Sequence, residues 1–173
     1  FDGSLAENIA RFGVVDMAKV EAATRAVGVH EVIMALPNGY ETRIGEDGCF
    51  LSGGQRQRIG LARAIYGDPK FIVLDEPNSS LDEAGDAALL QAIAQMKARG
   101  TTFVVMTHRV SVLGVADKML VLRDGTQQAF GPRDQVLAAL NQANQSAAQQ
   151  AQQAQAPAAA ASAASPTLVA PAA

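Results

Sequence analysis

The chain is poor in several residue types, and each shortage narrows the class of protein it can be. Its 173 residues include no tryptophan, one cysteine and only 5% aromatic side chains. The one thiol, Cys49, has no partner for an internal disulfide, so the sequence predicts a reduced, intracellular environment. A small residue packed in a loop is the favoured interpretation of Cys49, ahead of a reactive thiol.

Neither strong charge nor long apolar runs are present. The formal net charge is -3, from 14 basic and 17 acidic residues. A nucleic-acid partner would require clustered Lys and Arg, so DNA and RNA are not expected to bind. No charge-free run of about 20 strongly apolar residues occurs, and no basic segment followed by an apolar one opens the chain, so we expect neither a membrane span nor a signal peptide in it. The length suits one core of moderate size.

The composition changes abruptly after Leu140. Residues 141–173 contain fifteen Ala, seven Gln and no charged residue, with three prolines among the last 17 residues. Such a segment cannot bury a core, so we predict a disordered tail over 141–173, with some Ala and Gln helix near 143–155 left open.

A serine and two glycines stand before a helix-forming segment in the middle of the chain. The order Ser52-Gly53-Gly54 permits a tight turn into a helix, with Ser52 as its N-cap. Unpaired N–H groups and the helix dipole would then face outward and favour a bound anion. Alone, the pattern is better explained as a turn before an ordinary amphipathic helix whose buried stripe includes Ile59 and Ile65.

Two acidic residues follow a continuous apolar run. Residues 71–74 predict a strand that is apolar on both faces, as in the centre of a parallel sheet. Asp75 and Glu76 would emerge at its carboxyl end, where open α/β sheets place their ligands. Solvation of the strand end is one explanation. The functional explanation assigns Mg²⁺ to Asp75, because hard cations prefer carboxylate oxygens, and activation of an attacking water to Glu76 as general base.

The remaining pattern continues the alternation of strands and helices. Asp82 predicts the N-cap of a helix over 83–99, and residues 101–106 predict a second apolar strand that leads to His108. Beside the two acids, His108 could donate to a phosphate and help to orient water. A hairpin with its turn at Asp124-Gly125 and a helix over 133–140 complete the predicted elements.

Four of these segments, in this order, resemble the motifs of the ATPase (nucleotide-binding) domain of ABC transporters. Residues 51–55 resemble the signature motif, 71–76 the Walker B motif, 79–82 the D-loop, and His108 the switch histidine. The resemblance extends from Phe1 to about Leu140. It implies an α/β fold, namely the C-terminal part of an ABC-type P-loop NTPase domain, with a helical subdomain at 1–66 and a parallel-sheet core with a terminal hairpin at 67–140.

The resemblance also implies what the site residues do. Two ATPase domains would face each other head to tail and enclose ATP and Mg²⁺ between them. One domain would supply Asp75 for the metal, with Glu76 and His108 as catalytic residues. The other would bind the same ATP through its signature segment, and Asp82 of the D-loop would communicate across the interface. The signature residues are Leu51, Ser52, Gly53, Gly54 and Gln55.

One expected motif is missing. No Gly-x-x-x-x-Gly-Lys-Ser/Thr occurs, and none of the four lysines follows a glycine. Phosphoryl transfer depends on that loop for positioning and charge stabilisation. We therefore expect the chain by itself not to hydrolyse ATP. Phe1 falls in the middle of a motif, so we interpret the chain as a fragment whose Walker A motif, Q-loop and transmembrane domain lie upstream.

Within the family the chain looks most like type I secretion ATPases that export proteases, lipases or similar polypeptides. The loop with Thr42, Gly45 and Glu46 resembles the exporter X-loop, although Asp47 stands where exporters often carry Arg or Gly. The resemblance implies a homodimer, a transmembrane domain in the same chain, a periplasmic adaptor, an outer-membrane channel and a polypeptide cargo. It places the ATPase on the cytoplasmic face of a bacterial inner membrane.

Two other classes of protein remain open from the sequence. A non-transport ABC ATPase of the DNA-repair or translation type would share the signature and Walker B motifs. A non-catalytic interaction module would explain the missing Walker A motif without any upstream residues. The exporter-like loop and the acidic charge balance argue against the first alternative.

Overall fold

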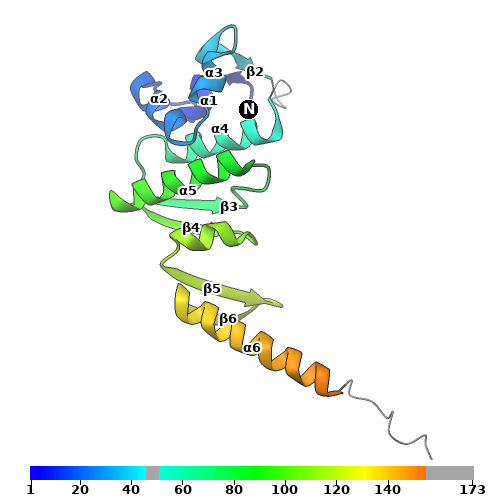
Figure 1. The fold of residues 1–173 in the computed structure, drawn as a ribbon. Helices are drawn as coiled ribbons and strands as arrows, with labels where there is room; N and C mark the ends of the chain where they lie inside the picture. The colour runs from blue at the N-terminus through cyan, green and yellow to red at the C-terminus, as the bar shows by residue number, and fades with distance from the viewer. Residues whose placement is uncertain (46–50, 155–173) are drawn as a thin grey trace, which may run out of the picture. The chain divides into compact units, whose positions relative to one another are not determined.

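The computed structural model describes residues 1–45 and 51–154 and divides into two compact units, Phe1–Val115 and Ala116–Ala173. The first unit contains, in order, β1 Gly3–Ser4, α1 Leu5–Ile9, α2 Met17–Ala26, α3 His30–Met34, η1 Gly39–Glu41, β2 Arg43–Ile44, α4 Gly53–Ile65, β3 Phe71–Asp75, α5 Glu83–Ala98, β4 Thr102–Met106 and η2 Val110–Val115 (Figure 1). The second contains β5 Lys118–Arg123, β6 Thr126–Pro132 and α6 Arg133–Ala154. This α/β composition confirms the predicted fold class; the division at residues 66 and 67 stays a prediction.

Helices α1, α4 and α5 begin at residues whose side chains cap them, and two of these caps, Ser52 and Asp82, are predicted from the sequence. Ser4 accepts a hydrogen bond from the Glu7 N–H, and the Glu7 carboxylate accepts one from the Ser4 N–H at 2.7 Å, which completes a capping box. Ser52 forms the same arrangement with Gln55 at the start of α4. Asp82 caps α5 by accepting from the N–H of Gly85.

The segment between α3 and α4 contains structure that the sequence did not predict. The sequence predicted a loop around Thr42 and Gly45, but β2 pairs antiparallel with β1 there. Each strand has only two residues, too few for a periodic pattern to be visible. Glu46, Asp47 and Cys49 lie outside the described residues, so the predicted X-loop is described only up to Gly45.

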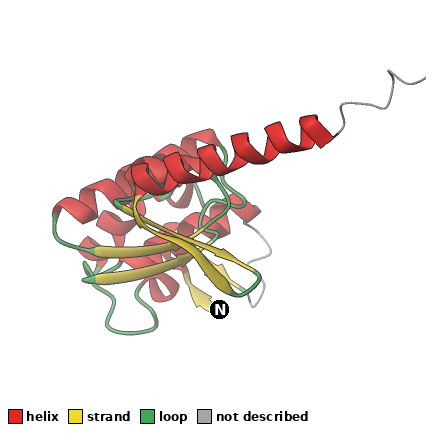
Figure 2. Ribbon diagram, turned by 90° about the horizontal axis from the view of Figure 1, so that it is seen from below, coloured by secondary structure: helices red, strands yellow, loops and turns green. Residues whose placement is uncertain are grey.

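A parallel pair of strands forms the sheet of the first unit. β3 and β4 pair in register from Phe71 opposite Thr102 to Asp75 opposite Met106, and α5 makes the crossover between them (Figures 1 and 2). Ile72 and Leu74 are buried, whereas Phe71 is 59% exposed. Both faces of β3 are apolar as predicted, but only one is covered within the part of the chain that the structure describes.

One hydrophobic cluster holds the first unit together. It joins residues from the N-terminal helices to residues from α4, α5 and β3, which ties the predicted helical subdomain to the predicted core. Its fully or nearly fully buried members are Leu5, Ile9, Val20, Val27, Val29, Ile33, Ala62 and Leu89. Burying a side chain such as Leu5 contributes about 1.5 to 3 kcal/mol, so this cluster fixes α4 beside β3 and α5.

The second unit is a hairpin and a long helix. Asp124 and Gly125 have φ of 49° and 72°, as a two-residue hairpin turn of type I′ requires, and α6 packs on β5 and β6. The sequence predicted an end of this helix near Leu140, but α6 continues to Ala154. Ala and Gln are good helix formers and no proline occurs between residues 133 and 156, which explains the longer helix. Residues 155–173 lie outside the described part of the chain. Among the helices that the structure describes, none is both long and apolar enough to cross a membrane.

Candidate functional site

Glu76 and His108 meet at the carboxyl ends of two adjacent parallel strands. Glu76 follows β3, and His108 follows β4 after one intervening residue. Their side chains are joined by a contact of 2.9 Å between His108 Nδ1 and Glu76 Oε1. The parallel pairing of β3 and β4 produces this contact, since it brings both strand ends to the same edge of the sheet. A carboxylate and an imidazole at this distance can share a proton or orient one water molecule between them and a substrate.

The second carboxylate oxygen of Glu76 is buried. Glu76 Oε2 has no hydrogen-bond partner among the residues that the structure describes, although the side chain as a whole is 39% exposed. A buried acceptor without a donor is unfavourable unless water or another group approaches it. Such an oxygen suits a general base, because its lone pairs are available for the proton of an incoming water.

Asp75 places a carboxylate next to Glu76 at the end of β3. It is exposed, whereas Ile72 and Leu74 of the same strand are buried. Mg²⁺ usually binds through one or two carboxylates together with phosphate oxygens and water, so an exposed aspartate at this edge fits that ion. Within residues 1–45 and 51–154, no group of three or more His, Cys, Asp and Glu is arranged to hold a metal on its own.

The signature segment forms the N-terminus of α4, as the sequence predicts. Ser52 Oγ accepts from the N–H of Gln55 at 3.2 Å, and Gln55 Oε1 accepts from the N–H of Ser52 at 2.9 Å. Leu51 is buried and anchors the turn. The N–H groups of Gly53 and Gly54, at the first two helical positions, have no intrahelical acceptor by helix geometry, so they can bind an anion.

A close approach explains why glycine stands at position 54. A Cβ atom there would lie 2.9 Å from the carbonyl oxygen of Ser80, inside normal contact distance. Ser80 belongs to the predicted D-loop, so the signature segment and the D-loop of this chain pack directly on each other. Any larger residue at position 54 would separate the two motifs.

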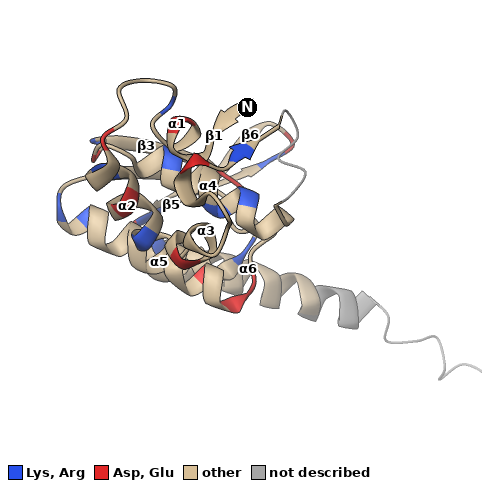
Figure 3. Cartoon of the chain, turned by 90° about the horizontal axis from the view of Figure 1, so that it is seen from above, with Lys and Arg blue, Asp and Glu red and all other residues tan. Residues whose placement is uncertain are grey.

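The carboxylate of Asp82 is held by a backbone N–H group and by a positively charged side chain. Its Oδ1 accepts from the Gly85 N–H at 2.9 Å and from the guanidinium of Arg58. These hydrogen bonds favour the ionised carboxylate and lower the pKa of Asp82 below its ordinary value, with the Gly85 N–H as the largest cause. Three arginines and no acidic residue lie on α4 (Figure 3). Arg58 therefore ties the basic helix to the end of the D-loop.

The sequence missed two polar residues that organise this region. Gln57 reaches from α4 to the backbone at Glu76 and to the D-loop. Asn78 is completely buried and bonds to residues of α5, η2 and the loop before His108. Gln57 lies one turn after Gly53 on the same helix, and Asn78 directly precedes the D-loop, so the sequence shows both residues beside predicted motifs. The sequence does not show their contacts, which join residues 8 to 33 positions apart.

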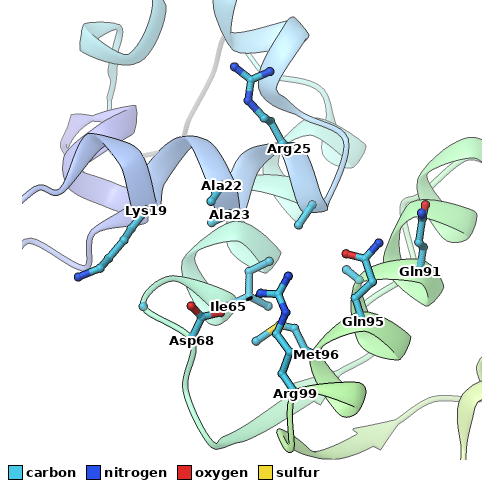
Figure 4. A pocket seen from close by; sticks show the side chains of 13 residues that line it. Lys19, Ala22, Ala23, Arg25, Ile65, Asp68, Gln91, Gln95, Met96 and Arg99 are labelled. Carbon is cyan, nitrogen blue, oxygen red and sulfur yellow. Dashed lines mark hydrogen bonds and ion pairs between the residues drawn. The ribbon is translucent and has the colours of Figure 1, made fainter.

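A separate pocket lies away from all of these residues. Its volume is about 380 Å³, and α2 and α5 form its walls (Figure 4). The three cations that line it are in ion pairs: Lys19 with Asp16 at 3.2 Å, Arg25 with Glu21 at 3.3 Å, and Arg99 with Asp68 at 3.4 Å. None of the predicted site residues lines it.

Comparison with known proteins identifies the class of protein to which this chain belongs. The family described as "ABC transporter" matches residues 3–79. The chain is 49% identical over 138 residues to a type I secretion system ATP-binding protein, PrsD, of Rhizobium meliloti, which covers 79% of this chain and 24% of that protein. It is 42% identical over 140 residues to human ATP-binding cassette sub-family B member 6, covering 80% and 16%.

The chain is also similar to a lipid A-core flippase and to an ABC exporter of known structure. An ATP-dependent lipid A-core flippase of Saccharophagus degradans is 43% identical over 127 residues, covering 72% of this chain and 21% of that protein. A bacterial Atm1-family ABC exporter with ATP bound matches with a TM-score of 0.73 and 31% identity, over 80% of this chain and 24% of the exporter.

These matches define an ATPase domain of the exporter class. The chain belongs to the ABC transporter family, as the four motifs indicated. It spans a quarter or less of the length of these relatives. The activity, cargo and partners of the whole protein can therefore only be proposed.

Proposed function

We propose that this chain is the C-terminal part of the ATPase domain of an ABC exporter and that Glu76 and His108 carry out hydrolysis there. The observation that supports this most directly is the 2.9 Å contact between His108 Nδ1 and Glu76 Oε1 at the edge of the parallel sheet. Mg²⁺ held at Asp75 would supply charge neutralisation of the phosphates. Glu76 takes the proton of the attacking water, and His108 holds the carboxylate in place and faces the terminal phosphate.

The signature segment acts on the nucleotide of a second ATPase domain. The N–H groups of Gly53 and Gly54, with the positive end of the α4 dipole, are suited to a phosphate that arrives from a partner. Two such domains would then close on ATP as a head-to-tail dimer and separate after hydrolysis. The arrangement of α4 and the D-loop side by side supports this, because both would lie at the same interface.

The exported cargo is proposed to be a polypeptide, by a type I secretion route. The 49% identity to a type I secretion ATP-binding protein supports this, while the flippase relative favours lipid as the second candidate. With the polypeptide route come a transmembrane domain in the same chain, a periplasmic adaptor and an outer-membrane channel. The ATPase would work at the cytoplasmic face of a bacterial inner membrane, without nucleic acid.

The chain by itself is proposed to be inactive. It contains no Gly-x-x-x-x-Gly-Lys-Ser/Thr loop to hold the phosphates of its own ATP. Purified chain should show no ATP turnover above that of its Glu76→Gln variant. Turnover that disappears in the variant would refute this part of the proposal.

The test of the shared site uses the whole protein that carries this chain. Glu76→Gln should trap an ATP-bound dimer, measured by size-exclusion chromatography with light scattering, because the amide cannot accept the proton of the water. Ser52→Arg in the same background should abolish that dimer by filling the anion-binding turn. Gln91→Ala, at an exposed position of α5, is the matched control and should leave the dimer intact. A dimer that is insensitive to Ser52→Arg would contradict the proposal.

The two cargo classes can be separated by stimulation of turnover. The purified whole protein in lipid vesicles would be tested with an unfolded secreted polypeptide and with lipid A. ATP turnover that rises with the polypeptide and not with the lipid supports type I secretion. The reverse result would support the lipid exporter.

A further inference from the structure

We propose that Gln57 is a positioning residue that holds the peptide of Glu76 in the conformation needed for hydrolysis and connects it to the signature turn. This inference depends on the proposed function, since it assigns Glu76 as the base. It concerns a residue outside the five signature positions 51–55. Gln57 acts through Glu76 and does not itself touch the reacting atoms.

The side-chain amide of Gln57 makes three hydrogen bonds. Its Nε2 donates to the backbone carbonyl of Glu76 at 2.8 Å and to Ser79 Oγ at 3.1 Å. Its Oε1 accepts from the backbone N–H of Ser80 at 2.8 Å. Both N–H bonds of the amide and its oxygen are therefore engaged, which fixes the side chain between α4 and the D-loop.

The backbone of Glu76 needs such support. Its φ is 44°, in the left-handed region that residues other than glycine seldom adopt. The N–H of Glu76 donates to the Met106 carbonyl at 2.9 Å, which continues the pairing of β3 with β4. The Glu76 carbonyl on the other side accepts from Gln57 Nε2 at 2.8 Å and, less closely, from the Ser79 N–H at 3.2 Å. The three bonds together hold the residue in a conformation that directs its side chain to His108.

The position of Gln57 on α4 also connects the Glu76 peptide to the first turn of that helix. Gln57 follows the anion-binding N–H groups of Gly53 and Gly54 by about one helical turn. Gly54 also packs on the Ser80 carbonyl, with a hypothetical Cβ at 2.9 Å. A shift of the first turn of α4 would therefore move the Gln57 amide and the Glu76 peptide together. Binding of a partner's phosphate at the signature turn is in this way linked to the position of Glu76, the proposed base of the same chain.

The test compares two replacements of similar length in the whole protein. Gln57→Met keeps the bulk and the helix propensity but removes all three hydrogen bonds. We expect kcat for ATP to fall on the order of 10-fold to 10²-fold, because a small displacement of a catalytic group has that effect. The KM for ATP should stay within about two-fold, since the nucleotide contacts are unchanged. Gln57→Lys restores a donor to the Glu76 carbonyl and should recover part of the lost kcat.

Two further measurements separate positioning from general damage and from failure of the proposed function. In the Glu76→Gln background, Gln57→Met should still allow the ATP-bound dimer to form. If Glu76→Gln alone traps no dimer, the proposed function fails. If the dimer forms but Gln57→Met has the kcat of the unmodified protein, only the role of Gln57 is overturned. Loss of the dimer on adding Gln57→Met, or equal loss of kcat in the Met and Lys variants, would also overturn it.

Discussion

The carboxamide oxygen of Asn78 accepts a hydrogen bond from Thr107 Oγ1 at 3.3 Å, and Thr107 directly precedes His108. The amide nitrogen of Asn78 donates to Asp86 Oδ1 at 2.9 Å and to Ser111 Oγ at 3.3 Å. Asn78 is completely buried, so its partners cannot be replaced easily by bulk water. Through this one side chain the D-loop, α5 and the loop that carries His108 are joined.

Asn78→Ala should lower the free energy of unfolding by about 1 to 3 kcal/mol. The reason is that Asp86 and Thr107, which are both partly buried, would each lose a hydrogen-bond partner. Urea unfolding of the chain, followed by circular dichroism, measures the change. Asn141→Ala, at an exposed position of α6, is the matched control and should change stability by less than about 0.5 kcal/mol. Equal effects of the two variants would show that the hydrogen bonds of Asn78 contribute nothing.

Replacements of Ser52 should separate its capping role from its role at the anion-binding turn. Ser52→Ala removes the capping box and should cost about 0.5 to 2 kcal/mol of stability. Ser52→Asp keeps an N-cap acceptor and should retain most of that stability. In the whole protein, however, its negative charge should prevent the ATP-dependent dimer.

Thermal unfolding and dimer formation in the Glu76→Gln background measure the two effects. Ser4→Ala is the control, because it breaks the equivalent capping box at α1 and should lower stability without affecting the dimer. If Ser52→Asp formed the dimer normally, the turn would not bind the phosphate.

Asp82 should make stability depend on pH in the acid range. Its pKa in the folded chain lies below the ordinary 3.8, because the carboxylate accepts from Gly85 and Arg58. A lowered pKa adds stability above the unfolded pKa, and this contribution is lost as the pH falls through the folded pKa. The melting temperature of the chain should therefore exceed that of Asp82→Asn at pH 7 by more than at pH 3. A difference that is the same at both pH values would contradict this.

The hydroxyl of Tyr40 should stabilise the N-terminal helices. It lies 2.7 Å from His30 Nδ1 and is also bonded to Thr24 Oγ1, and all three side chains are buried. Burial raises the pKa of Tyr40, because the charged phenolate is disfavoured there. Tyr40→Phe should cost about 1 to 2 kcal/mol.

The other tyrosine provides the control. Tyr66 donates to the Val14 carbonyl at 3.1 Å in a more exposed position, so Tyr66→Phe should cost less. Urea unfolding of both variants checks the order. A larger loss in Tyr66→Phe would mean that the buried hydroxyl of Tyr40 is not a significant source of stability.

Much of the local structure could be predicted from the sequence. Ser52 and Asp82 cap helices where the pattern placed them, and the apolar runs before Glu76 and His108 form strands. These features depend on neighbouring residues, so a short window of sequence contains their cause. The family could be predicted for a related reason: its motifs are short segments of fixed residue type and order.

The sequence did not predict features that depend on tertiary contacts or on the length of an element. The pairing of β1 with β2 joins residues about 40 positions apart through only two residue pairs, too few to leave a pattern. The extension of α6 to Ala154 was left open by the sequence, and it follows from helix propensity in a segment that lacks a core-forming face. The roles assigned to Asp75, Glu76, Asp82, His108 and the signature residues stay predictions.

The sequence by itself determined the elements, their caps, the ABC-type motifs and the absence of a phosphate-binding Gly-Lys-Ser/Thr loop from the chain. Only the tertiary structure decided that Glu76 and His108 touch and that Gly54 lies against Ser80. It also decided that Gln57 bonds to the D-loop and that Asn78 bonds to Thr107. The physical reason is that caps and strands are stabilised by groups a few residues apart. The site, in contrast, is made by hydrogen bonds between groups about 20 to 30 positions apart, which the parallel pairing of β3 with β4 and the packing of α4 bring together.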